Sequence, residues 1–117
     1  MEYQGDLRER CFRFSVALVK LVRRERNGII ERAILDQLIR SGTSIGANVA
    51  EAAAASSRKD FVRFNEYALR SANETVYWLC LIRDAYGSSD ECIKLLNECT
   101  QLSRILGSIV VKLKSSL

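Results

Sequence analysis

Apolar side chains recur at intervals of three and four residues along almost the whole chain, and this spacing restricts its fold more than any other feature. Near the N-terminus the series is Leu7, Cys11, Phe14, Leu18 and Leu21. Residues three and four apart lie on one face of an α-helix, so the series predicts a helix with one apolar side. The 117 residues include no proline and many strong helix formers, so we expect an all-α protein.

Capping and turn residues predict where the first two helices begin and end. Asp6 with Glu9 resembles a capping box, and Asn27-Gly28 suits the left-handed backbone that ends a helix. A second apolar series starts at Ile30 and keeps its period to Ala52. Although Ser and Gly are poor helix formers, the unbroken period predicts one long second helix across the glycines.

Two further helices follow from the same signals. Ser57 with Asp60 predicts the start of a third helix, which runs to about Tyr86. Gly87 ends it, and Ser88 with Glu91 predicts the start of a fourth helix that extends to the C-terminal region. Short connections between amphipathic helices make sequence neighbours antiparallel, which predicts an up-down-up-down four-helix bundle with residues 1–117 as a single domain.

Three small residues recur every four positions in the centre of the second helix: Gly42, Gly46 and Ala50. On a helix they form a strip with almost no side chain, so we interpret them as a site of close helix packing, within one chain or between chains. A phosphate-binding loop is the weaker alternative, because the segment lacks the lysine of the P-loop pattern and a preceding strand.

Polar residues on the same helix form a second group. We interpret Arg40, Ser44, Asn48 and Glu51 as a structural polar network in preference to a ligand site. A buried Asn needs partners for both ends of its amide, and such a residue fixes register or oligomeric state.

The composition excludes several kinds of catalysis. Without a single histidine the chain has no Ser/His/Asp triad, no Cys/His pair and no histidine metal site. The four cysteines form no CxxC pair and sit among apolar residues, so we expect buried thiols, with a redox pair as the alternative. A carboxylate metal site at Glu51, Glu66 and Glu74 is disfavoured. We expect no enzyme activity, no metal and no cofactor.

Positive charge is concentrated near the N-terminus. Residues 1–27 contain seven basic and four acidic side chains, which gives +3 of the net +4. A solvated helix face explains this in a monomer, whereas repetition around an oligomer would create a ring of positive potential for a nucleic-acid backbone. The candidate nucleic-acid-binding residues are Arg13, Lys20, Arg23, Arg24 and Arg26.

Three segments resemble one known family. They are Arg40-Ser-Gly-Thr-Ser-Ile-Gly-Ala-Asn-Val-Ala-Glu51, Ser57-Arg-Lys-Asp-Phe61 and Asn73-Glu-Thr-Val-Tyr-Trp-Leu79. Together they are similar to the four-helix-bundle 23S rRNA-intervening-sequence proteins, to which the accessory proteins of retroelement reverse transcriptases are related. The resemblance implies a homopentamer and no established catalytic residues. Ala52 stands where many members have Gly, which leaves the branch of the family open.

From these observations we expect a cytoplasmic, homo-oligomeric bundle that binds RNA or DNA weakly and without reading base sequence. The alternative is a protein-interaction or assembly module that binds no nucleic acid. The resemblance also implies a possible protein partner such as a reverse transcriptase. No signal peptide and no apolar run long enough to span a membrane is present in the sequence given, so no membrane association is expected.

Overall fold

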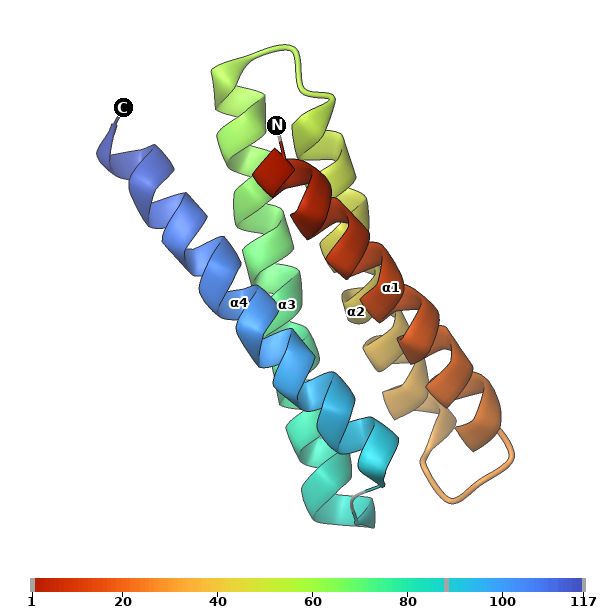
Figure 1. Ribbon diagram of the computed structural model, residues 1–117. Coiled ribbons are helices and arrows are strands. Elements are labelled where there is room, and N and C mark those ends of the chain that lie inside the picture. Colours follow the sequence, from red (N-terminus) through yellow and green to blue (C-terminus); the bar gives the residue numbers. More distant parts are fainter. Residues whose placement is uncertain (1, 88, 117) are drawn as a thin grey trace.

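Four long helices form an antiparallel up-down-up-down bundle in the computed structural model (Figure 1). The structure describes residues 2–87 and 89–116, with side chains from Leu7 onward. The helices are α1 (Glu2–Glu25), α2 (Arg32–Ala53), α3 (Arg58–Tyr86) and α4 (Asp90–Ser115). They pack into a body of 46 × 23 × 21 Å. The predicted fold class is therefore confirmed.

The helix starts differ from the predictions by a few residues. Helix α1 begins at Glu2, so the prediction of a start at Asp6 is wrong. Helix α2 begins at Arg32, and its N-cap Glu31 makes no side-chain capping bond. The turn at Gly28 is closed by its N–H, which donates to the carbonyl oxygen of Glu25 at 2.9 Å. Among the described residues only Gly87 has positive φ, so the expected left-handed turn at Asn27-Gly28 is not formed.

Serine hydroxyls cap the last two helices. Ser57 accepts from the backbone N–H of Asp60 at 3.1 Å, as the sequence predicted. For α4 the capping residue is Ser89, which accepts from the N–H of Cys92 at 3.1 Å. The predicted cap, Ser88, lies outside the described residues. The connection between α3 and α4 turns at Gly87, whose φ of 92° favours glycine.

The apolar series of all four helices meet in one core. The five apolar residues of α1 named above are all buried, and α2 is helical straight through its glycines. The other three helices contribute to the same cluster, for example through Leu38 of α2, Leu79 of α3 and Leu102 of α4. Sequence reading missed Asn65 and Thr75, which are fully buried although polar.

Two glycines let α1 approach α2 closely within the chain. A Cβ added at Gly42 would lie 2.0 Å from Leu18 Cδ2, and one at Gly46 would lie 3.2 Å from the Cβ of Cys11. At these two positions of α2, residues of α1 thus occupy the space that a side chain would need. Ala50, the third member of the strip, is exposed and takes no part in this buried contact.

The cysteines are free thiols at the helix contacts. Cys11, Cys92 and Cys99 are buried and Cys80 is half-buried. Burial raises the pKa of Cys11 to about 12, with a further increase from the charge of Glu98. Burial likewise raises the pKa of Cys99 to about 12. These two thiols stay protonated at neutral pH, which fits the interpretation as small core residues.

No helix in the described part of the chain is long and apolar enough to cross a membrane.

Paired Gly→Ala substitutions test the contact between α1 and α2. Gly107 lies in α4, and a Cβ there would meet only Leu69 Cδ1 at 3.9 Å. Gly107→Ala should therefore stabilise the protein by about 0.5–1 kcal/mol, the usual gain in a helix interior. Gly42→Ala should destabilise it by about 1–2 kcal/mol because Cδ2 of the fully buried Leu18 must move within a packed core. Urea unfolding measures the free energy of unfolding of both variants. An equal increase in stability in the two variants would contradict the close contact between α1 and α2.

Thiol alkylation tests the burial of the cysteines. Iodoacetamide at pH 8 should modify the partly accessible Cys80 in the folded protein. It should leave Cys11 and Cys99 unmodified, because both are buried and their raised pKa keeps them as unreactive thiols. In guanidinium chloride all four should react. Mass spectrometry of tryptic peptides locates the adducts, and rapid native labelling of Cys99 would contradict the raised pKa.

Candidate nucleic-acid interface

Helices α1 and α4 border an open groove along one side of the bundle. They lie on the same side of the molecule (Figure 1) and form the smallest contact of the four adjacent helix pairs. The groove has a volume of about 530 Å³. Phe14 and Ala17 of α1 and Leu95 of α4 form its apolar floor. Core packing fixes the position of this floor, because Phe14 and Leu95 are largely buried.

Basic side chains from both helices line this groove. Three of the predicted residues, Arg13, Lys20 and Arg24, come together there, and the fold adds Arg10 and Lys94. The same lining holds two carboxylates, those of Glu91 and Glu98, so its net charge is +3. Lys94 was missed because only the pairing of α4 with α1 brings it to this face.

The carboxylates neutralise part of this charge. Glu98 is held by Arg10 through two hydrogen bonds, of 3.0 Å from Nε and 2.7 Å from Nη2. Glu91 is 3.9 Å from Arg24, at the limit of an ion pair. Within the described part of the chain, Lys20 and Lys94 form no ion pair. These two lysines, one on each helix, are the groove's uncompensated charges.

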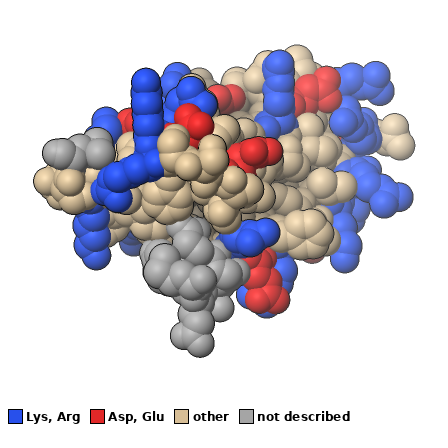
Figure 2. All heavy atoms as spheres, turned by 90° about the horizontal axis from the view of Figure 1, so that it is seen from above, with Lys and Arg blue, Asp and Glu red and all other residues tan. Residues whose placement is uncertain are grey.

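The remaining predicted residues lie away from the groove. Arg23 is exposed on α1 but does not line the groove. Arg26 follows the end of α1 and donates to Asp36 at 2.9 Å, so this carboxylate offsets part of its charge. Seen from the end of the bundle, basic side chains project on several sides with acidic ones between them (Figure 2). The α1/α4 groove therefore has a local excess of positive charge, on a surface where basic residues also occur on several other sides.

The predicted polar network forms only in part, and it extends to α3. Asn48 donates to the carbonyl oxygen and to the hydroxyl of Ser44, each at 2.9 Å. Ser71 of α3 donates to the hydroxyl of Ser44 at 3.1 Å. The side chains of Arg40 and Glu51 are exposed and form no hydrogen bond or ion pair among the described residues, so in this structure they lie outside the network.

One turn away, a second hydroxyl pair joins the same two helices. Ser41 of α2 and Thr75 of α3 are hydrogen-bonded at 2.9 Å, and Thr75 also lies 2.7 Å from the carbonyl oxygen of Ser71. Both side chains are buried, with Thr75 fully so. The polar contacts of α2 and α3 are thus internal and fix how these helices align.

Another groove, of about 620 Å³, lies between α1 and α2. Its α2 wall consists of small residues, among them Gly46, Ala47 and Ala50. Phe12 lines the α1 side and is 69% exposed. Arg8 and Glu9 provide one charge of each sign at this groove. A large exposed aromatic side chain beside a wall of small residues is typical of a protein contact surface.

No group of three Cys, Asp or Glu side chains with metal-binding geometry occurs within the described residues. Neither groove therefore offers a metal centre there. What the α1/α4 groove provides is a set of fixed positive charges over an apolar floor, which suits binding of a polyanion.

Comparisons with known proteins place this architecture in a family. A comparison with curated proteins finds no match. Among solved structures, a protein of unknown function from the S23 ribosomal protein family of Bacteroides thetaiotaomicron is 36% identical, with a TM-score of 0.84. The match covers 92% of this chain and 96% of that one. The family model for the 23S rRNA-intervening sequence protein matches residues 5–108. The chain therefore belongs to the 23S rRNA-intervening sequence protein family.

Proposed function

We propose that this protein is a non-enzymatic, homo-oligomeric bundle that binds RNA, or a related nucleic acid, through the α1/α4 groove. Its contacts go to the phosphate backbone, so binding does not depend on base sequence. The observation that carries the proposal is the excess of cations in this groove, where Lys20 and Lys94 face solvent without ion pairs in the described chain.

The side chains in the groove support backbone binding in preference to base readout. Arginine and lysine neutralise phosphates and release condensed counterions, a term independent of sequence. Stacking of single-stranded bases needs exposed aromatic rings in the groove. Its one aromatic residue, Phe14, is only 3% exposed, so stacking contributes little there.

Assembly would place several copies of the groove on one particle. We assign the interface between subunits to the α1/α2 groove, where the exposed Phe12 of one copy packs against Gly46, Ala47 and Ala50 of the next. Arg8 and Glu9 beside it allow opposite charges to meet across such a contact. The resemblance to the family favours five subunits. Repetition of a +3 groove raises the affinity for a long polyanion by avidity.

A second candidate function is a protein-interaction module without nucleic-acid binding. The apolar floor of the α1/α4 groove favours it, since an acidic amphipathic helix would bury apolar residues there and pair with the basic rim. A reverse transcriptase is a partner of this kind that the family resemblance suggests. Purification from the native host with one stoichiometric protein and no RNA would favour this alternative.

Removal of charge tests the nucleic-acid interface. The triple variant Arg13→Gln, Lys20→Gln, Lys94→Gln removes three cations that line the groove. Its affinity for a structured RNA should fall at least about tenfold at low salt, and the slope of log K against log salt should decrease by about 2. Fluorescence anisotropy over a salt series measures both quantities.

A matched variant with the same net charge provides the control. Lys59, Arg70 and Arg104 are exposed, and none of them lines the α1/α4 groove. At about 0.15 M salt, where long-range attraction is screened, substitution of all three by Gln should leave RNA affinity within about twofold, whereas the groove variant should still bind more weakly. Equal losses in the two triple variants would show that net charge alone drives binding. No binding by the wild type at low salt would refute the proposal.

Substitution of Phe12 tests the assembly surface. Phe12→Asp places a charge at the proposed interface and should convert the oligomer to a monomer with unchanged helical content. Val111 of α4, which is also 69% exposed and lies outside the α1/α2 groove, supplies the control. Val111→Asp should leave the mass unchanged. Light scattering with circular dichroism distinguishes these outcomes, and a monomeric wild type would contradict assembly.

A further inference from the structure

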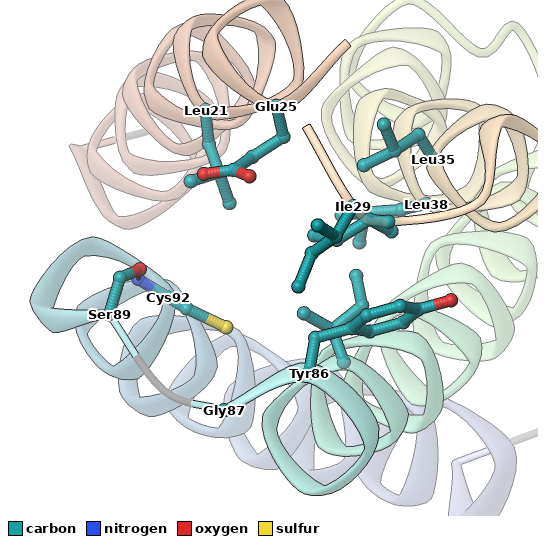
Figure 3. A pocket seen from close by; sticks show the side chains of 11 residues that line it. Leu21, Glu25, Ile29, Leu35, Leu38, Tyr86, Gly87, Ser89 and Cys92 are labelled. Carbon is teal, nitrogen blue, oxygen red and sulfur yellow. Dashed lines mark hydrogen bonds between the residues drawn. The ribbon is translucent and has the colours of Figure 1, made fainter. Parts of the chain in front are cut away.

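A cavity opens at the end of the bundle where α1 meets α2 and α3 meets α4. Its volume is about 270 Å³, and its walls come from all four helices and both connections (Figure 3). Most of the lining is aliphatic, including Leu21, Leu35, Leu38 and Ile82. The ring of Tyr86 forms one wall, and the sulfur of Cys92 points inward.

One charged side chain lines this cavity. The carboxylate of Glu25, on the last turn of α1, lies at its margin beside Leu21 (Figure 3). Glu25 is half-buried, and its carboxylate has no hydrogen bond or ion pair among the described residues. A half-buried carboxylate without a protein partner beside apolar walls is positioned to accept a charge-assisted hydrogen bond from a cationic group bound there.

Nearby arginines are paired with other carboxylates. Arg26 donates to Asp36 at 2.9 Å, and Arg83 pairs with Asp84 at 2.8 Å. Arg24 is 3.9 Å from Glu91. These pairs leave the charge of Glu25 available for a ligand.

Hydrogen bonds fix the loop that covers the cavity. The hydroxyl of Tyr86 donates to the carboxylate of Glu31 and accepts from the Glu31 backbone N–H at 3.3 Å. This connects the α1–α2 loop to the end of α3. Gly28 passes so close to Glu25 that an added Cβ would lie 3.2 Å from Oε2, so the loop backbone and the carboxylate are adjacent.

From this arrangement we propose that the cavity binds a small apolar molecule bearing one cationic group, with the carboxylate of Glu25 as its counter-ion. The volume limits the size of the ligand. A cavity of about 150 Å³ accepts benzene, so about 270 Å³ holds one ring with a short alkyl amine chain. The proposal is independent of nucleic-acid binding, because Glu25 does not line the α1/α4 groove.

Three probes of similar shape and different charge test the site. They are 2-phenylethylamine, the neutral propylbenzene and the anionic 3-phenylpropanoate, each titrated into ¹⁵N-labelled full-length protein and followed by NMR. The amine should shift the amide signals of the lining residues saturably. It should bind about tenfold more tightly than propylbenzene, as expected for one partly screened charge-assisted contact. The carboxylate should cause no saturable shift.

Variants separate the charge from the cavity. Glu25→Gln should weaken amine binding about tenfold and leave propylbenzene binding unchanged. Glu51→Gln is the matched control, because Glu51 is exposed on α2 and does not line this cavity, and it should have no effect. Cys92→Leu fills the cavity and should abolish binding of both probes, with circular dichroism to check that the variant is folded.

Several results would overturn the proposal. One is the absence of saturable shifts in the lining residues with the amine. Another is equal affinity of wild type and Glu25→Gln for it, and a third is binding of 3-phenylpropanoate as tight as that of the amine. If Cys92→Leu fails to fold, the comparison of Glu25→Gln with Glu51→Gln still decides the role of the carboxylate.

Discussion

The close approach of α1 to α2 is the constraint on which the arrangement of the bundle depends. Leu18 fills the space that a side chain at Gly42 would occupy, and Cys11 lies against Gly46. This contact holds α1 close to α2, while α1 and α4 contact each other least. The groove with its basic rim is therefore a consequence of how α1 is seated. The glycines act on the candidate interface indirectly, because they position the helix that carries most of its cations.

Alignment of α2 with α3 has a different physical basis. The hydroxyl pairs of Ser41 with Thr75 and Ser44 with Ser71 occur at the contact between these helices. Each such bond contributes only about 1 kcal/mol net. Thr75 and Ser41 also bond to carbonyl oxygens of their own helices, so the pairs add direction to the contact more than they add stability. Apolar packing is not directional, whereas the hydroxyl pairs favour one alignment of the two helices.

Much of the fold was predictable because helix formation and amphipathicity are local properties. The apolar series identified four helices, the fold class, and the core position of residues such as Leu18 and Leu21. Asn65 and Thr75 were missed because polar side chains are usually placed on the solvent side of a helix. Thr75 is bonded across to Ser41 of α2, which only the fold brings near. Asn65 donates within its own helix to the carbonyl oxygen of Phe61 at 2.9 Å, and its Oδ1 has no donor among the described residues.

The candidate sites were less predictable, because they depend on which helices become neighbours. The charge near the N-terminus identified Arg13, Lys20 and Arg24, but Lys94 joins them only through the α1/α4 pairing. Arg26 lies outside the groove and pairs with Asp36, a contact that the local sequence did not reveal.

The contact between α1 and α4 joins the two helices that are farthest apart in the sequence. The other three adjacent pairs are joined by short connections, while α1 and α4 meet across nearly the full length of the chain. Closing so long a segment costs more chain entropy than closing a hairpin. Direct closure of this contact from the unfolded chain is therefore the most costly of the four in entropy, so we expect α1 and α4 to pair after the hairpin contacts have brought them together.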